Sequence, residues 1–190
     1  MKELNPTAEK IVDLAESYMQ SRGFNGFSFR DIQNELGIKT ASIHYHFKTK
    51  QDLAQTVFER YLVNYEVALK RIESQDISAE GKIEALADIF VDVRENNKLC
   101  LCGMYASDFY FLADGLESLL SKFVQINEDF IRKSIEQGIA SGHFRSGLEA
   151  TEAARLIFVA LEGGILLSQF KDTDYIRSVK ASCLNILKAS

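Results

Sequence analysis

A short polar segment in the first quarter of the chain carries side chains that could bind nucleic acid. Residues 39–46 read Lys-Thr-Ala-Ser-Ile-His-Tyr-His, so they supply ammonium, hydroxyl and imidazole groups and contain no carboxylate. On a helix, such hydrogen-bond donors can reach base edges in the major groove of DNA, whereas a carboxylate would be repelled by the phosphates. Recognition of double-stranded DNA is therefore the chemistry that these residues could perform.

Two short helices must hold this segment at the surface. Apolar residues recur at helical spacing in residues 29–36, Ser28 precedes them as a candidate N-cap, and Asp31 takes the position of a capping-box acid. Gly37 follows, and glycine allows the left-handed backbone of a tight corner between helices. The pattern predicts a helix-turn-helix in which residues 39–46 form the second helix.

The same residues resemble a known family motif. The TetR family of bacterial transcriptional regulators is similar to this chain in the stretch LGIKTASIHYHFKTKQDL, where a glycine turn leads into a short recognition helix, an aromatic cluster and a Lys-x-x-Leu helix start. The family usually has Ser or Thr in place of Lys39, Lys in place of Thr40 and Tyr in place of His44. These departures affect which DNA sequence the helix would prefer. The resemblance still implies the family's binding mode, with the second helix in the major groove.

Two further stretches resemble the family. The join between the family's first two helices is similar to RGFNGFSFRDI, and its C-terminal helix, glycine-bearing turn and long apolar helix are similar to SIEQGIASGHFRSGLEATEAARLIFVALEGGILL. Helical spacing continues along the chain without a strand or hairpin pattern, so we expect an all-α fold of about nine helices. Residues 1–53 would form an N-terminal three-helix helix-turn-helix DNA-binding domain, and residues 54–190 a C-terminal helical ligand-binding and dimerisation domain.

The expected DNA-contacting residues fall into two groups. The candidates for base-edge contacts are Lys39, Thr40, Ser42 and His44. The candidates for phosphate contacts are Ser28, Tyr45 and Lys50. Ala41 and His46 complete the predicted set, although His46 could instead pack near Phe47. We expect no metal site at the two histidines, because residues two apart on a helix point to different sides.

The net charge of −5 does not argue against DNA binding. Residues 1–53 hold seven basic and seven acidic residues, so the excess of five acids lies in residues 54–190. Phosphate attraction depends on the local surface, and a neutral domain with one basic face can bind. We therefore expect DNA affinity that falls strongly with salt.

Composition also indicates the compartment. The N-terminus leads into an amphipathic helix instead of a signal peptide, and no apolar run is long enough to span a bilayer. The three cysteines are an odd number without framework spacing, which is typical of a reducing compartment. The expected localisation is cytoplasmic, with no membrane partner and no structural disulfide.

Two apolar stripes near the C-terminus form the expected dimer interface. The resemblance implies a homodimer, because two recognition helices must enter successive major grooves about 34–36 Å apart on a palindromic operator. The stripes comprise Leu156, Ile157, Ala160, Leu161, Gly164 and Ile165, and then Ile176, Val179, Cys183 and Ile186. Periodicity does not separate an interface from a core, so packing within one protomer remains the alternative.

The resemblance further implies a pocket for a small-molecule effector of unknown identity. The candidate ligand-binding residues share aromatic or thioether side chains and are Tyr61, Tyr65, Phe90, Met104, Tyr105, Phe109, Phe123 and Phe130. They include no charged residue, which favours an apolar effector, although these side chains could equally form plain core. Cys100 and Cys102 could sense an electrophile or an oxidant, or could be small buried hydrophobic residues.

We therefore expect a ligand-responsive transcriptional regulator, with repression the commoner outcome in the family. An enzyme is not expected, because the chain has no Gly-x-Ser-x-Gly, no phosphate-binding glycine loop and no His-Glu-x-x-His. We expect no cofactor. The alternative is a helical protein-interaction module that does not bind DNA.

Overall fold

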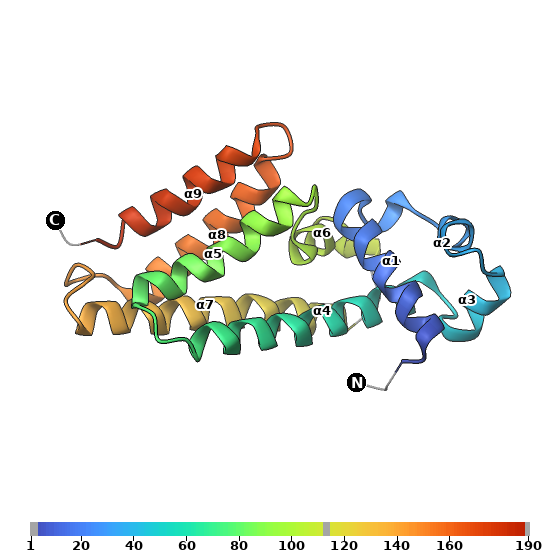
Figure 1. The fold of residues 1–190 in the computed structure, drawn as a ribbon, viewed down its shortest axis with the longest axis horizontal. Coiled ribbons are helices and arrows are strands. Elements are labelled where there is room, and N and C mark those ends of the chain that lie inside the picture. The colour runs from blue at the N-terminus through green and yellow to red at the C-terminus, as the bar shows by residue number, and fades with distance from the viewer. Residues whose placement is uncertain (1–3, 112–114, 189–190) are drawn as a thin grey trace. The chain divides into compact units, whose positions relative to one another are not determined.

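The computed structural model describes residues 4–111 and 115–188 as a succession of helices (Figure 1). The α-helices are α1 (Pro6–Arg22), α2 (Phe29–Leu36), α3 (Thr40–His46), α4 (Lys50–Glu73), α5 (Ala79–Glu95), α6 (Leu101–Ser107), α7 (Leu116–Ala140), α8 (Ala150–Leu167) and α9 (Thr173–Asn185). The 3-10 helices are η1 (Phe24–Gly26) and η2 (Phe109–Phe111). No strand forms in the described ranges, so the prediction of an all-α fold with about nine helices is confirmed.

Local capping determines where the first helices begin and end. The Asn5 side chain accepts hydrogen bonds from the backbone N–H groups of Thr7 and Ala8 at 3.1 and 2.9 Å, and so caps α1. Pro6 occupies the first turn, where its missing N–H does no harm. Gly23 ends α1 with a φ of 78°, a backbone conformation that favours glycine.

The chain forms two compact units. Unit 1 contains residues 1–64 and 101–121, and unit 2 contains residues 65–100 and 122–190. The helices α4 and α7 each contribute residues to both units. Compactness is a different criterion from function, so the division into functional domains at residues 53 and 54 stays a prediction.

The core of unit 1 includes α6 as well as the first three helices. Helix α1 packs against α2, α3 and α6. Tyr105 of α6 is buried, and its hydroxyl donates to the carbonyl oxygen of Ala54 at 2.8 Å and lies 2.8 Å from the sulfur of Met19. Burial raises the pKa of Tyr105 well above its ordinary value. Tyr105, which is far from Met19 and Ala54 in the sequence, thus helps to stabilise the packing of the N-terminal helices.

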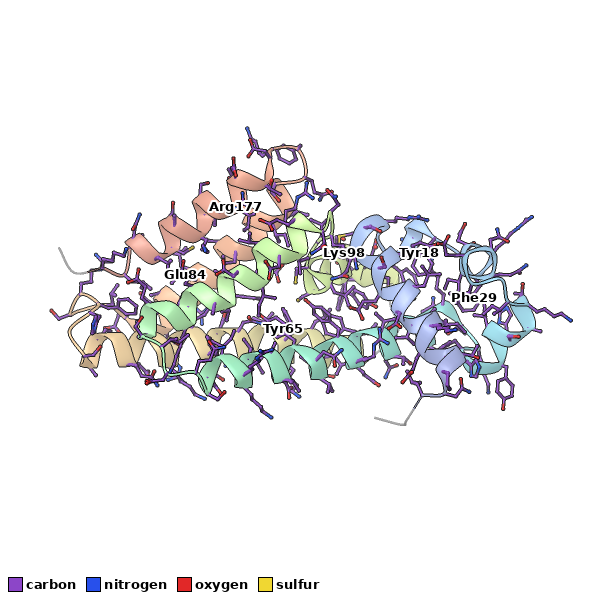
Figure 2. All side chains as sticks on the ribbon, viewed as in Figure 1. Tyr18, Phe29, Tyr65, Glu84, Lys98 and Arg177 are labelled. Atoms are coloured by element: carbon purple, nitrogen blue, oxygen red, sulfur yellow. The ribbon has the colours of Figure 1, made fainter. Side chains whose placement is uncertain are left out.

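A chain of aromatic contacts runs through the core of unit 2. The Tyr65 ring lies 4.6 Å from Phe123, and Phe158 of α8 lies 6.3 Å from Phe123 and 6.4 Å from Phe90, centroid to centroid. The hydroxyl of Tyr65, which Figure 2 labels on α4, donates to Oδ1 of buried Asn127 at 2.5 Å. These rings join α4, α5, α7 and α8 within the unit.

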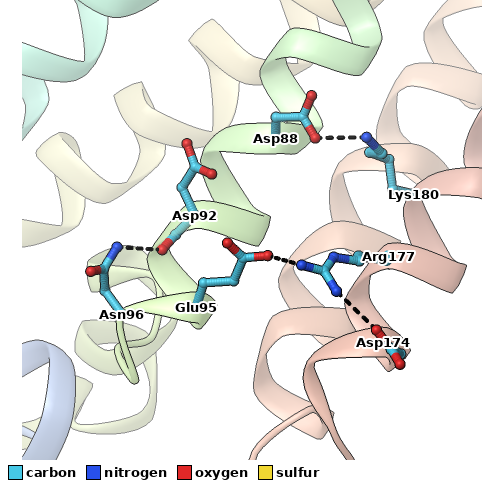
Figure 3. A network of polar contacts seen from close by, with 7 residues as sticks. All are labelled: Asp88, Asp92, Glu95, Asn96, Asp174, Arg177 and Lys180. Atoms are coloured by element: carbon cyan, nitrogen blue, oxygen red, sulfur yellow. Dashed lines mark hydrogen bonds and ion pairs between the residues drawn. The ribbon is translucent and has the colours of Figure 1, made fainter.

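The last two helices pack closely on each other. A Cβ added at Gly164 of α8 would lie 2.9 Å from Cδ1 of Ile176 and 3.1 Å from a methyl carbon of Val179, both in α9. Helix α9 also lies alongside α5, where Lys180 contacts Asp88 at 2.6 Å and Arg177 pairs with Glu95 (Figure 3). Since these charges are partly exposed, each pair contributes little, and the apolar contacts hold the helices together.

Candidate nucleic-acid interface

The predicted turn and both of its helices are present in unit 1. Ser28 begins α2 in a capping box with Asp31, and Gly37 ends α2 in the left-handed conformation with a φ of 64°. Ile32 of α2 and Ile43 of α3 are fully buried, which fixes the side of each helix that faces the protein. The opposite side of α3 is therefore turned to solvent.

The outer side of α3 presents the predicted donors. The side chains of Lys39, Thr40, Ala41, His44 and Tyr45 are exposed, and those of Ser42 and His46 are partly exposed. Tyr45 reaches furthest, at 83% exposure, and its ring meets His46 edge-on with centroids 5.0 Å apart. The helix thus offers hydroxyl, ammonium and imidazole groups to a partner.

Helix α2 orients two of these side chains. The Thr40 hydroxyl donates to the side-chain oxygen of Gln33, so it retains lone pairs but no proton for an outside partner. The His44 ring meets Phe29, labelled on α2 in Figure 2, edge-on at 5.1 Å between centroids. Both side chains are held before any partner arrives, which reduces the conformational entropy lost on binding.

Ser28 is exposed, but its donors are already used. Its hydroxyl and its backbone N–H donate to Oδ2 of Asp31 at 2.6 and 2.7 Å. These two hydrogen bonds lower the pKa of Asp31. A phosphate oxygen accepts hydrogen bonds and cannot donate them, so the predicted Ser28–phosphate contact would first have to break the capping box.

Lys50 binds backbone carbonyl groups within unit 1. Its ammonium group donates to the carbonyl oxygens of Phe24 and Phe27 and lies 4.6 and 4.2 Å from the centroids of their rings. Burial lowers the pKa of Lys50, and nearby Asp108 opposes that shift. The prediction of Lys50 as a phosphate ligand stays untested, and such a contact would compete with the two carbonyl oxygens that this ammonium group already binds.

Other basic residues are better placed for phosphates. Arg30 near the start of α2 and Lys48 just after α3 are both exposed. Sequence reasoning counted their charges but did not include them among the DNA-binding residues. Their positions on either side of the donor-rich helix were the signal that could have identified them.

Most of the predicted dimer residues lie inside the protomer. The buried members are Ile157, Leu161, Gly164, Ile165, Ile176 and Cys183, while Ala160 and Val179 are partly buried. This stripe of α8 packs on α9 and α5 of the same chain, which is the alternative that the sequence left open, and a dimer interface at these positions stays a prediction. Leu156 and Ile186 remain exposed, at 60% and 41%.

The outer side of α8 carries a different apolar stripe, which we call the outer stripe. It consists of Leu156, Val159, Leu166 and Leu167, followed by Phe170 just after the helix, all of them exposed. Gly163 lies on the same side, and a Cβ added there would have no protein atom within 4 Å. A partner helix could approach the backbone closely at this glycine.

The eight predicted ligand-binding residues belong to both units. Unit 1 holds Tyr61, Met104, Tyr105 and Phe109, and unit 2 holds Tyr65, Phe90, Phe123 and Phe130. Tyr105 is engaged in the core of unit 1, and Phe109 is 41% exposed. The members in unit 2 are all buried, so they lie in the interior of that unit.

A cleft opens between α4 and α7 within unit 2. It has a volume of about 340 Å³, and charged groups surround it, including Lys122, which pairs with Glu66 at 2.5 Å. Phe130 lines it, and no other predicted ligand-binding residue does. Most of its lining residues are charged, unlike those of the apolar pocket expected from the sequence.

The cysteines are buried thiols. Cys100, Cys102 and Cys183 are at most 7% exposed, and burial raises the pKa of Cys183. Cys100 hydrogen-bonds the carboxyl group of Glu162, a residue that sequence reasoning did not single out. Within the described ranges, no group of His, Cys, Asp and Glu side chains is arranged to hold a metal ion, and no helix is long and apolar enough to cross a membrane.

Comparison with protein-family models covers both units. A model described as "Bacterial regulatory proteins, tetR family" matches residues 11–57. A second model, "Tetracyclin repressor-like, C-terminal domain", matches residues 79–182. The first match includes α2 and α3, and the second includes α5 to α8 and most of α9.

Individual proteins resemble the chain over most of its length. A solved TetR transcriptional regulator from Legionella pneumophila is 31% identical, with a TM-score of 0.85 over 99% of this chain and 100% of that one. The HTH-type transcriptional repressor KstR2 of Rhodococcus jostii is 20% identical and is aligned over 78% of this chain and 72% of its own length. The fatty acid metabolism regulator protein of Bacillus subtilis is 21% identical over 92% of this chain and 90% of its own length.

Proposed function

Because the chain belongs to the TetR family of bacterial regulatory proteins, we propose that it is a ligand-responsive repressor that binds a palindromic operator as a homodimer. The chain is a DNA-binding transcriptional regulator and not an enzyme. The observation that best supports the finer proposal is the exposed, carboxylate-free side of α3 after the Gly37 turn. We expect the protein to act in the cytoplasm, where the operator lies.

In this proposal α3 lies in the major groove. Lys39, Ser42 and His44 donate to base edges, and each good contact contributes about 1–3 kcal/mol of discrimination between bases. Because Thr40 donates its proton to Gln33, it can accept from the amino group of adenine or cytosine. Tyr45, with Arg30 and Lys48, contacts phosphates and sets the orientation of the helix.

We propose the outer stripe of α8 as the dimer interface. Leu156, Val159 and Phe170 are 60%, 59% and 72% exposed, and apolar side chains gathered on one helix side commonly mark a protein interface. A two-fold arrangement would pair the stripe with its own copy and would bring two α3 helices to successive grooves. Gly163 would be the point of closest helix approach.

Effector binding belongs to unit 2 in this proposal. The aromatic residues that join α4, α5, α7 and α8 surround the interior of that unit. A ligand that binds better to the conformation without DNA weakens operator affinity, with a coupling typically of about 1–3 kcal/mol. Such a difference is enough to release a repressor from its operator.

A gel-shift titration with DNA from the gene's own promoter region tests the proposal at two salt concentrations. We expect a dimer to bind, and we expect its affinity to fall steeply at the higher salt, since phosphate contacts release counterions. A protein that stays folded but binds no promoter DNA at low salt would instead support the alternative of a helical protein-interaction module.

A further inference from the structure

A buried acid lies in the apolar part of α8. Oε1 of Glu162 is buried and has no hydrogen-bond partner among the residues that the structure describes. The thiol of Cys100 donates to the carboxyl group. A carboxylate offers about four acceptor positions, so one thiol leaves most of its hydrogen-bonding capacity unused. Buried polar groups in native proteins are nearly always bonded, and this exception requires an explanation.

The other buried polar groups of unit 2 do have partners. Asn127 accepts from Tyr65 and donates to the carbonyl oxygen of Phe123 at 2.8 Å. Ser134 and Ser168 donate to backbone carbonyl oxygens at 2.9 and 2.6 Å. Satisfaction within the chain is therefore the rule in this core, and Glu162 departs from it.

Ion pairing also distinguishes Glu162 from similar residues. Glu66 likewise has a buried Oε1 without a hydrogen bond, but Lys122 neutralises it at 2.5 Å. Arg60 has a buried Nε, and its other nitrogens pair with Asp13 and Glu16 at 2.6 and 2.9 Å. Within the described ranges no basic side chain lies within ion-pair distance of Glu162.

The surroundings of Glu162 are apolar and aromatic. One turn away on the same side of α8, Phe158 and Ile165 are 4% and 1% exposed. Phe158 is part of the aromatic contact chain through Phe90 and Phe123. Burial raises the pKa of Glu162 to about 7, although the hydrogen bond from Cys100 opposes this. A cation bound at this carboxyl group would have an acceptor in a largely apolar environment, with the aromatic residue Phe158 one helical turn away.

We propose that Glu162 binds the ammonium group of an apolar organic amine, whose hydrocarbon part packs against the aromatic side chains of unit 2. This inference rests on the proposed function, because it names the chemical class of the effector. It differs from the expectation of an apolar or electrophilic effector, since the eight predicted residues included no acid.

Matched probes test the proposal directly. Phenylalkylamines with two, four and six methylene groups would be compared with the alcohols and the carboxylic acids of the same chain length. Binding to the full chain would be measured by calorimetry at about pH 8, where Glu162 and the probe amines are mostly charged. We expect at least one amine to bind about tenfold more tightly than its alcohol, and the acids to bind more weakly than the alcohols.

Two variants test whether the preference for amines over alcohols depends on Glu162. E162Q keeps the shape and the acceptor oxygen but removes the charge, so we expect it to bind amines and alcohols equally. E152Q changes an exposed acid on the same helix and should keep the preference of the unaltered chain. Equal binding of amine and alcohol to the unaltered chain at all three lengths, including no binding of either, overturns the proposal without any variant. An amine preference that survives in E162Q overturns it too.

Failure of this proposal is distinguishable from failure of the proposed function. Gel shifts with promoter DNA would be run on the unaltered chain and on E162Q without any amine. If both bind DNA and neither prefers amines, the regulator stands and the amine site is rejected. If amines bind through Glu162 and no DNA binds, the amine site stands and the repressor function is rejected.

Discussion

Helices α3 and α8 differ in which side carries the polar side chains and which side carries the apolar ones. The exposed side of α3 carries donors such as Lys39 and Tyr45, and its buried side is apolar. The exposed side of α8 carries apolar residues such as Val159, and its interior side carries the acid Glu162. A surface of donors suits a charged polymer, whereas an exposed apolar stripe suits a second protein surface. The proposed tasks of the two helices therefore differ, and substitutions can separate them.

The strongest test of this contrast introduces a charge into the outer stripe. Val159→Asp should disrupt the dimer, because an uncompensated charge buried in an interface costs about 3–5 kcal/mol. Sedimentation velocity would show a monomer, and operator affinity would fall with it. The nearby exposed position Glu152 provides the control, since Glu152→Gln should leave the dimer intact. A Val159→Asp protein that sediments as a dimer would show that the interface lies elsewhere.

The interior acid of α8 should make stability depend on pH. Glu162 has a pKa raised from 4.5 to about 7. As the pH rises from 4.5 to about 7, the unfolded chain releases this proton first, so the folded state loses about 3 kcal/mol of stability. Below that window both states hold the proton, and above it the loss is complete.

Urea unfolding at several pH values measures this effect. The difference in unfolding free energy between the unaltered chain and Glu162→Gln should shrink toward acidic pH and grow toward neutral pH, in favour of the variant. If the unfolding free energies of the two proteins change with pH in parallel, Glu162 ionises as an exposed acid does.

The exposed donors of α3 should affect DNA preference rather than folding. Lys39→Ala should remove about 1–3 kcal/mol of discrimination at one base position, because Lys39 is proposed to donate to a base edge. Tyr45→Ala should weaken binding to all sequences alike, since its proposed contact is a phosphate. Anisotropy titrations with an operator and its single-base variants measure both effects. Uniform weakening by both substitutions would contradict this division of roles.

The smallest expected effects distinguish the roles of Lys48 and Lys50 in unit 1. Lys48→Met should reduce the slope of log affinity against log salt by about 0.9, because it removes one proposed phosphate contact. Lys50→Met should leave that slope unchanged and reduce stability by about 1 kcal/mol, through the hydrogen bonds to Phe24 and Phe27. If Lys50→Met lowers the slope and Lys48→Met does not, the assignment is reversed.

The residues around the turn could be predicted because their signals are local. Ser28, Asp31 and Gly37 act within one turn of the chain, and capping and left-handed geometry depend on neighbours in sequence. The contacts of Lys50 with Phe24 and Phe27 could not be predicted, because these residues are more than twenty positions away in the sequence.

The environment of the residues proposed to act in unit 2 depends on packing between distant segments. An apolar helix such as α8 has residues suited to the interior on more than one side, and periodicity did not show which side faces α9. Glu162 was missed, although it is the single charged residue between Arg155 and Lys171. Such an isolated acid in an apolar helix is a sequence signal, but its contact with Cys100 follows only from the fold.

In the proposed complex, α3 enters a groove of duplex DNA twice in each assembly. Hydroxyl-radical footprinting on promoter DNA tests it most directly, with the unaltered chain beside Val159→Asp. We expect two protected patches about one helical turn apart, related by two-fold symmetry, and lost when the dimer is disrupted. A single patch that persists in Val159→Asp, or no protection at any protein concentration, would contradict it.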